Sequence, residues 1–283
     1  MKNNPRAFNI LGNIAIVKFP RHRRTPKNLK KRFLLGAKKK FAEKILRKNK
    51  PVKTILEKQG KVKGRLRKIQ TKYLVGEKTK EVLYKENNCV FRFNVDSTYF
   101  SPRLSNERKE IALKIKKHEN VLVMFSGVAP YPIVIAKNSK AKKVFAVEIN
   151  REANKYAKLN IELNNVKENV EIIQGDIKKV AKKITSKGGV NVRGTLVPLR
   201  FDVIVMPRPQ LKDSFLREAF MLSKKNTRIY YYDFCNENEI NLIKEKIKSE
   251  AKNSKKKIKI LKIKTAGEIA PYKIRVRIDF KIV

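Results

Sequence analysis

The sequence predicts an α/β protein in which a small basic α+β domain, residues 1–95, precedes a larger domain, residues 96–283. In the second part, short apolar segments alternate with amphipathic ones, and such strand–helix alternation is typical of a mostly parallel sheet covered on both faces. In the first part, one helical pattern lies among short strand-like segments separated by Gly and charged turns. The chain has 283 residues, enough for two cores of this kind.

The first domain is expected to begin with a bent strand or hairpin over Phe8–Phe19, where apolar and polar residues alternate around Gly12. Apolar residues at helical spacing then predict a helix over Lys27–Lys48. The strands expected after it are Thr54–Gln59, Arg65–Leu74, Glu81–Lys85 and Cys89–Val95.

The second domain is expected to alternate strands and helices. Its predicted strands are Val121–Phe125, Lys143–Glu148, Val170–Ile173, Phe201–Met206 and Arg228–Asp233. Its predicted helices are Ser105–Lys117, a segment after the first strand up to Asn138, Arg151–Asn164, Lys212–Leu222 and Glu237–Ser249. Between them, Gly188–Leu199 is expected to be irregular. The closing segments Lys257–Thr265 and Lys273–Val283 are expected to pair as an antiparallel edge.

The charge balance is unusual, because 70 Lys and Arg face 25 Asp and Glu, a net charge of +45. So large an excess attracts polyanions and predicts nucleic acid binding. A lysine-rich, thermophilic proteome would explain the lysines but not the shortage of acids. Two Cys and two His are too few for a disulfide framework or a zinc cluster, so we expect no metal. No stretch reaches the roughly 18–20 apolar residues of a membrane span, and we expect a cytoplasmic protein.

Three strand ends carry residues suited to one ligand. Phe125–Pro130 follows the first strand, and Gly127 lets the backbone approach a ligand at a helix N-terminus. Glu148 ends the second strand and can accept both hydroxyls of a ribose, and Asp176 follows the third, where it can accept an adenine amino group. Ligands of open α/β sheets lie at this edge. Taken singly, the Gly is a common structural residue and each acid a common helix cap.

The spacing of these residues nevertheless predicts an adenosine site. The first loop lacks the G-x-G-x-x-G pattern of dinucleotide folds, since Ala129 takes the place of the middle glycine and Pro130 follows. This favours S-adenosylmethionine over NAD as the cofactor.

Short runs over nearly the whole chain form one pattern: Phe8–Ala15, Gly64–Arg67, Val95-Asp96, Tyr99–Arg108, Met124–Tyr131, Val147-Glu148, Gly175-Asp176 and Ala270–Tyr272. The pattern resembles the archaeal and eukaryotic tRNA guanine-37 N1-methyltransferases, a family that also makes or feeds wyosine precursors. The run from Phe100 to Arg108 is its most specific part. The chain is most similar to a short archaeal form, expected to lack the family's N-terminal domain for the tRNA elbow.

The resemblance implies a class I (Rossmann-like) S-adenosylmethionine methyltransferase domain after a small RNA-recognition domain. It implies methylation of N1 of the guanine just 3′ of the anticodon. Glu107 matches the family's general base, which removes the N1 proton, and Arg67 matches the arginine that meets O6. Without the resemblance, Glu107 reads as an acid in a first helical turn and Arg67 as a solvated arginine.

The implied site has two sets of residues. Those expected at the cofactor are Phe125, Ser126, Gly127, Val128, Pro130, Glu148, Ile149, Asp176, Ile177 and Met206. Those expected at the anticodon stem-loop of tRNA are Arg103, Arg108, Tyr131, Pro207 and Arg208. The two arginines at 103 and 108 suit phosphate contacts and salt bridges equally. Phe100 suits base stacking or a core. We expect a monomer.

Two positions depart from the family pattern and leave alternatives open. Val123 replaces an acid at the end of the first strand, and Pro207 replaces an Asn that helps to hold the guanine, with Arg208 as the candidate substitute. The rival function is transfer of the aminocarboxypropyl group of the same cofactor to the wyosine base. Methylation of carbon 7 of the demethylwyosine precursor is a further possible activity, and an RNA-binding protein with a decayed cofactor pocket is the third reading.

Overall fold

The computed structural model describes residues 8–19, 30–186, 190–192, 194–207 and 213–283. The chain divides into two compact units, each described below by itself. The first comprises Met1–Glu86 and Val90–Phe100, and the second comprises Asn87–Cys89 and Ser101–Val283.

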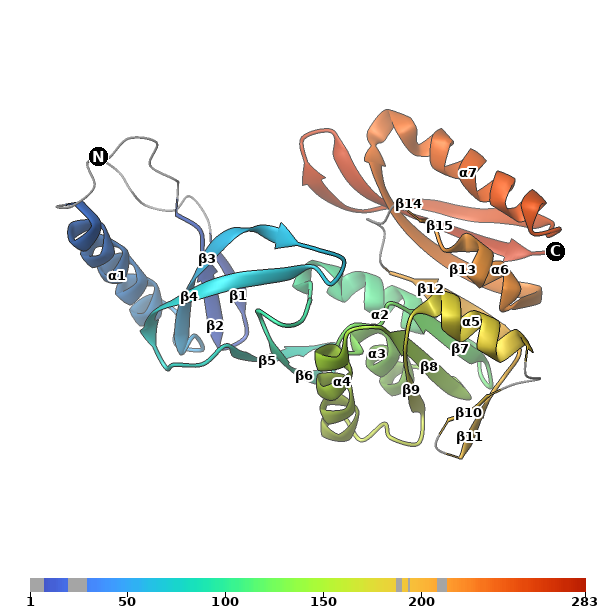
Figure 1. The fold of residues 1–283 in the computed structure, drawn as a ribbon, viewed down its shortest axis with the longest axis horizontal. Coiled ribbons are helices and arrows are strands. Elements are labelled where there is room, and N and C mark those ends of the chain that lie inside the picture. The colour runs from blue at the N-terminus through green and yellow to red at the C-terminus, as the bar shows by residue number, and fades with distance from the viewer. Residues whose placement is uncertain (1–7, 20–29, 187–189, 193, 208–212) are drawn as a thin grey trace. The chain divides into compact units, whose positions relative to one another are not determined.

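The first unit is a four-stranded sheet in the order β1-β2-β3-β4 with one helix packed on it (Figure 1). Its elements are β1 (Phe8–Leu11), β2 (Ile14–Val17), α1 (Lys30–Lys48), β3 (Thr54–Lys63) and β4 (Lys68–Gly76), followed by the separate pair β5 (Glu81–Glu86) and β6 (Cys89–Asn94). β1 and β2 pair antiparallel on either side of Gly12, which confirms the predicted hairpin. Ala42 and Ile45 of α1 pack in the core with residues of β2, β3 and β4.

The second unit contains a seven-stranded sheet in the order β14-β15-β13-β12-β7-β8-β9. Its strands are β7 (Asn120–Met124), β8 (Lys143–Glu148), β9 (Val170–Gln174), β12 (Phe201–Met206), β13 (Ser223–Asn236), β14 (Ile258–Ala270) and β15 (Lys273–Ile282). Neighbouring strands from β9 to β13 are parallel, and β15 and β14 add the antiparallel edge. The predicted fold class is therefore confirmed, including the closing hairpin.

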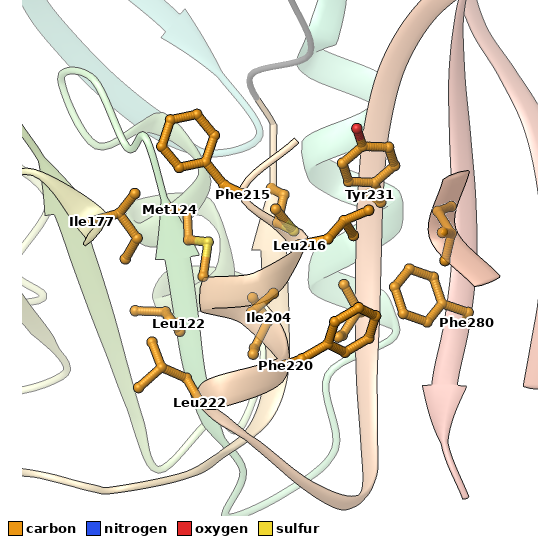
Figure 2. Close-up of a cluster of buried hydrophobic side chains, with 14 of the residues drawn as sticks. Leu122, Met124, Ile177, Ile204, Phe215, Leu216, Phe220, Leu222, Tyr231 and Phe280 are labelled. Carbon is orange, nitrogen blue, oxygen red and sulfur yellow. The ribbon is translucent and has the colours of Figure 1, made fainter. Parts of the chain in front are cut away.

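Helices cover both faces of this sheet (Figure 1). One face packs against α5 (Ile177–Ser186), α6 (Leu216–Met221) and α7 (Ile240–Asn253), and the buried side chains of this layer form the cluster drawn in Figure 2. The remaining helices are α2 (Ser105–Leu113), α3 (Pro130–Asn138) and α4 (Arg151–Leu163), with short 3₁₀ turns at Pro102–Leu104 and Glu237–Glu239. α3 packs on β8 and on α2, and α4 packs on β8 and β9. Because β7 and β12 lie between two helical layers, their inner residues are fully buried.

Some elements differ from the sequence prediction. No element was predicted for Ile177–Ser186, which forms α5. Its buried residues Ile177, Ala181 and Ile184 recur at helical spacing and could have indicated this helix. Part of Gly188–Leu199 forms a small hairpin, β10 (Val190–Val192) with β11 (Thr195–Val197). β13 extends beyond the predicted Arg228–Asp233 at both ends, and at its C-terminal end the antiparallel partner β15 pairs with it as far as residue 236.

Gly12 is a position where the backbone requires glycine. Its φ is +53°, and an added Cβ would lie 1.8 Å from the carbonyl oxygen of Leu83. We therefore expect Gly12→Ala to lower the free energy of unfolding by at least about 1–2 kcal/mol, the cost of the left-handed conformation alone. The matched control is Gly36→Ala, because Gly36 lies in α1 with open space around it. That change is expected to raise stability by about 1 kcal/mol. Denaturant unfolding of both variants measures the difference, and equal effects would contradict the close approach at Leu83.

Candidate active site

The loop after β7 turns sharply at the carboxyl edge of the sheet. Phe125, Gly127 and Ala129 all have positive φ, at 58°, 58° and 65°. Left-handed conformations at two non-glycine residues cost about 1–2 kcal/mol each, and strained residues of this kind are enriched at ligand sites. The turn ends at Pro130, the first residue of α3, so the loop and the N-terminus of that helix lie together at this edge.

Glu148 ties the first two strand ends together. Its Oε2 accepts a hydrogen bond from the backbone N–H of Gly127 at 2.8 Å, and its Oε1 accepts one from Asn150 N–H at 2.8 Å. A carboxylate has about four lone-pair sites, so acceptor capacity remains for hydroxyl groups of a ligand. The next residue, Ile149, leads into α4, which Asn150 caps.

At the third strand end, the acidic residue caps a helix. Oδ1 of Asp176 accepts from Lys178 N–H at 3.0 Å, as a helix-capping acid does at the start of α5. The side chains of Ile177 and Met206 are buried in the hydrophobic cluster beneath this edge. Phe125 packs edge-on against Phe215, with ring centroids 5.0 Å apart.

The residues at this edge fit a polar cofactor. The hydroxyl of Ser126 is buried and has no hydrogen-bond partner among the described residues, and the same holds for Oδ1 of Asn154. A buried polar atom without a partner costs about 1–3 kcal/mol. A polar ligand that fills the loop region would satisfy such a group.

Glu107 lies in the first turn of α2 and is only 5% exposed. Three side chains donate hydrogen bonds to its carboxylate. Oε1 accepts from Lys264 Nζ at 2.8 Å, while Oε2 accepts from Arg277 Nη1 at 2.6 Å and from the Tyr232 hydroxyl at 3.0 Å. The carboxylate is therefore buried but well satisfied.

The strand register explains how three distant residues reach one carboxylate. Arg277 of β15 lies directly opposite Tyr232 of β13 on one side and opposite Lys264 of β14 on the other. Directly opposite side chains of antiparallel strands point to the same face of the sheet. The three donors therefore form one cross-strand row, named here the donor row, and α2 lies against it.

The donor row belongs to a charge-balanced cluster. Arg277 is fully buried and also contacts Glu110 at 2.5 Å and Asp279 at 2.7 Å, while Lys264 also pairs with Glu110. Lys114 lies 3.6 Å from Asp279. Burial by itself would raise the pKa of Glu110, but hydrogen bonds from Arg277 and Lys264 lower it to about 2. The same contacts raise the pKa of Lys264, so its ammonium group remains protonated.

A hydrogen-bond chain links Glu107 to the helix that follows the cofactor loop. The Tyr131 hydroxyl lies 3.1 Å from the Tyr232 hydroxyl, which in turn donates to Glu107. Burial raises the pKa of Tyr131 to about 12 and that of Tyr232 well above its ordinary value. Both phenols therefore keep their protons and can donate. Glu107 thus lies within two hydrogen bonds of the first turn of α3.

Arg67 belongs to the first unit, in a tight turn whose backbone N–H donates to Gly64 at 3.1 Å. Its guanidinium lies over the ring of Tyr99, 4.4 Å from the centroid, an arrangement typical of a cation–π contact. Its Nε is buried and has no hydrogen-bond partner among the described residues. The first unit also holds Phe100, which packs against the rings of three aromatic residues: Tyr84, Phe91 and Phe93.

The residues expected at the tRNA differ in exposure. Arg103 is exposed, whereas Arg108 is only 1% exposed and donates to the Ser101 carbonyl at 3.0 Å. Tyr131 is 3% exposed, so its ring presents no open stacking face in this structure. Pro207 is half-buried, and the expected role of Arg208 lies outside the described residues.

The donor row was not predicted from the sequence. A signal was present in the closing strand, where Arg277 and Asp279 alternate with apolar residues and so face one side of the sheet together. Among the described residues no helix is both long and apolar enough to cross a membrane. The described part of the chain also brings together no group of three His, Cys, Asp or Glu side chains suited to a metal ion.

Comparisons with known proteins agree over nearly the whole chain. Residues 82–261 match the TRM5/TYW2 methyltransferase domain, and residues 1–79 match the TYW2 N-terminal domain. The chain is 33% identical to tRNA (guanine(37)-N(1))/4-demethylwyosine(37)-methyltransferase Taw22 of Nanoarchaeum equitans, over 98% of this chain and 100% of that protein.

Solved structures give the same picture. The crystal structure of Trm5b from Pyrococcus abyssi is similar with a TM-score of 0.79 and 30% identity, covering 98% of this chain and 75% of that one. The complex of aTrm5 with tRNALeu shares the fold, with a TM-score of 0.77 and 24% identity over 98% of this chain and 72% of that one.

The doubly wound sheet and the match to the TRM5/TYW2 methyltransferase domain identify an S-adenosylmethionine-dependent methyltransferase of class I, and the match confirms the cofactor expected from the sequence. The chain belongs to the TRM5/TYW2 methyltransferase family and is a tRNA methyltransferase.

The cluster around Arg277 predicts a dependence of stability on pH. A carboxylate whose pKa is depressed on folding contributes stability above its ordinary pKa and loses it as pH falls through the folded value. For Glu110 this range runs from 4.5 down to about 2. We therefore expect stability to fall over this range, and to fall less steeply in Glu110→Gln. Thermal unfolding midpoints between these pH values provide the measurement. Glu162→Gln, on the exposed side of α4, is the control, and a slope in Glu110→Gln equal to that of the control would refute the assignment.

Proposed function

We propose that the protein transfers a methyl group to N1 of guanine 37 in tRNA, with Glu107 as the general base. The observation that carries this proposal is the placement of the Glu107 carboxylate, held by three donors and joined through Tyr232 to Tyr131 beside the cofactor loop. The relatives named for guanine 37 support the choice of base and position.

The chemistry requires a base because N1 of neutral guanine carries a proton. Its lone pair becomes available only when that proton is removed, and a positioned carboxylate typically contributes about 10²–10⁴ in rate. When bound, S-adenosylmethionine supplies the methyl group from its sulfonium. Glu107 would accept the N1 proton and become a neutral acid, while the electron pair of the N–H bond stays on the purine.

Arg67 would stabilise the charge that deprotonation moves onto O6 of the guanine. Its guanidinium is supported from one side by the ring of Tyr99, and its Nε has no partner among the described residues. A donor that the protein leaves unsatisfied is available to an incoming oxygen. These features support the role that the family resemblance assigns to this arginine.

The polar groups at the three strand ends would hold the cofactor. Glu148 would accept the ribose hydroxyls with the acceptor sites that Gly127 and Asn150 leave open. Ser126 would donate from its buried hydroxyl. Asp176 would receive the adenine amino group while it caps α5. Phe125, Val128, Pro130, Ile149, Ile177 and Met206 complete the proposed cofactor set.

The partner is tRNA, and we propose the anticodon stem-loop as the region bound. The net charge of +45 favours association with the phosphate backbone. Arg103 is exposed and suited to a phosphate contact, whereas Arg108 is engaged inside the protein and suits a structural role. Because the target base must leave its stack to reach a pocket, phosphate contacts would hold the distorted loop.

Two further activities follow from specific observations. The relative from Nanoarchaeum equitans is named for both guanine and 4-demethylwyosine, which favours methylation of the wyosine precursor as a second activity. The rival, aminocarboxypropyl transfer from the same cofactor, is kept as a second candidate because Pro207 replaces the Asn of the family pattern. The released nucleoside separates the two: S-adenosylhomocysteine accompanies methyl transfer, and methylthioadenosine accompanies the rival reaction.

Replacing the base tests the proposal directly. We expect Glu107→Gln to lower the rate of N1-methylguanosine formation by about 10²-fold or more, because an amide cannot accept the N1 proton. Mass spectrometry of tRNA nucleosides after incubation with labelled cofactor measures the product. The matched control is Glu152→Gln, which also replaces an acid in the first turn of a helix and should leave the rate unchanged.

The result is interpretable only if Glu107→Gln is folded, so its cofactor affinity is measured by calorimetry alongside the rate. Guanine methylation at the wild-type rate would remove Glu107 from the role of base. Release of methylthioadenosine by the wild-type protein would replace the proposed reaction with the rival one.

Ser126→Ala tests the cofactor loop. If the hydroxyl donates to the cofactor, we expect its loss to weaken S-adenosylmethionine binding by about 5–10-fold, corresponding to about 1 kcal/mol for one hydrogen bond. The same change should leave the stability of the free protein unchanged or slightly higher, because it removes a buried polar atom without a partner. Calorimetry and thermal unfolding give the two values. A fall in stability with unchanged affinity would contradict a ligand role for this hydroxyl.

A further inference from the structure

We propose that Lys264 and Arg277, both from the hairpin β14–β15, are positioning residues for Glu107 in the methyl-transfer reaction. Arg277 and Tyr232 donate hydrogen bonds to one carboxylate oxygen of Glu107, Oε2. Lys264 donates to the other oxygen, Oε1, and keeps it in position to accept the proton. This inference rests on the proposed role of Glu107 as the general base and makes that role specific to one atom.

The hydrogen bonds distinguish the two oxygens of Glu107. Oε2 accepts from Arg277 at 2.6 Å and from Tyr232 at 3.0 Å, whereas among the described residues Oε1 accepts only from Lys264, at 2.8 Å. Each carboxylate oxygen offers two lone-pair sites. Oε2 is therefore saturated, and Oε1 has one site left for the N1 proton.

The two cations of the donor row have different exposure. The Arg277 side chain is 0% exposed and its fork is fixed by Glu107, Glu110 and Asp279, so it sets the orientation of the carboxylate. The Lys264 side chain is 35% exposed and contacts the oxygen with a free site. Lys264 is therefore the member of the row nearest to where a substrate could approach Glu107.

The surrounding charges determine how proton uptake depends on pH. Besides the donor row, the groups paired with Glu107 or with its partners are Glu110, Lys114, Tyr131 and Asp279. The guanidinium of Arg108 lies farther out, 5.8 Å from the centre of the Tyr131 ring. The directly paired ionic groups are three carboxylates and three cations. When Glu107 takes the proton at Oε1, the N1–H bond breaks, an O–H bond forms and the cluster is left one positive charge in excess. The cations therefore favour the carboxylate before the transfer.

The test is the rate of a single turnover of methyl transfer to tRNA as a function of pH. In Lys264→Gln, loss of one cation in contact with the carboxylate should move the acidic limb of the profile upward by about one pH unit or more. The matched control is Lys259→Gln, because Lys259 is an exposed lysine on the same strand. Its acidic limb should coincide with that of the wild type, and the dissociation constant for tRNA should be equal in the two variants.

Conservative variants separate charge from geometry. Lys264→Arg retains the cation and should restore the position of the acidic limb. Arg277→Lys retains the charge but loses the fork, so its rate should fall at every pH. Because Arg277 is buried, the unfolding midpoint of the Arg277→Lys variant is measured in parallel with its rate. The conclusion about the acidic limb depends on the variants of Lys264, which is partly exposed.

Two results would overturn the inference. An unchanged acidic limb in Lys264→Gln with weaker tRNA binding would make Lys264 a phosphate contact. A lower unfolding midpoint with unchanged limb and unchanged rate would make it a purely structural partner. Either result leaves the proposed function standing if Glu107→Gln is inactive, whereas an active Glu107→Gln would remove the base itself.

Discussion

The structure of the larger unit depends on the burial of one guanidinium. Arg277 is fully buried, and an unpaired charge in such a position would cost several kcal/mol. Its five donors are accommodated because Glu107, Glu110 and Asp279 all reach it. Two of these acids come from α2 and one from β15, so the helix and the closing hairpin can only adopt positions that satisfy the same side chain. The register of β13, β15 and β14 and the position of α2 are therefore fixed together.

This constraint reaches the cofactor edge of the sheet through neutral groups. Tyr232 joins the donor row to Tyr131, and Tyr131 lies in the first turn of the helix that follows the strained loop. On the other side of that loop, Glu148 holds Gly127 by its backbone. Hydrogen bonds thus act on this loop from both sides, through Glu148 at Gly127 and through Tyr232 at Tyr131. Within a buried region, such hydrogen bonds favour one geometry over others.

The sequence predicts those features that local patterns determine. Lys143–Glu148 and Phe201–Met206 are strands with the predicted bounds, because a central strand buried on both faces is a continuous apolar run. Ile177–Ser186 was missed, although its apolar residues recur at helical spacing. The strand ends were predicted as the ligand edge from the topology and from Gly127, Glu148 and Asp176. The contacts of Arg277 were not predicted, because they depend on the pairing of strands far apart in sequence. The burial of Tyr131 was not predicted either, because Tyr131 packs against Tyr232, a residue far away in the sequence.

Several of the acidic residues of this basic chain balance cations within the fold. Glu107, Glu110 and Asp279 satisfy the donor row, Glu119 pairs with an arginine of β13, and Asp96 pairs with a lysine in the first unit. Much of the remaining positive charge is left for the solvent-facing side chains, where it attracts a polyanion. Salt acts differently on the two sets, since it screens exposed charges over about 10 Å at 0.1 M but affects buried pairs much less. The same excess of lysine and arginine can therefore bind RNA in a salt-sensitive way while the pairs that position Glu107 stay intact.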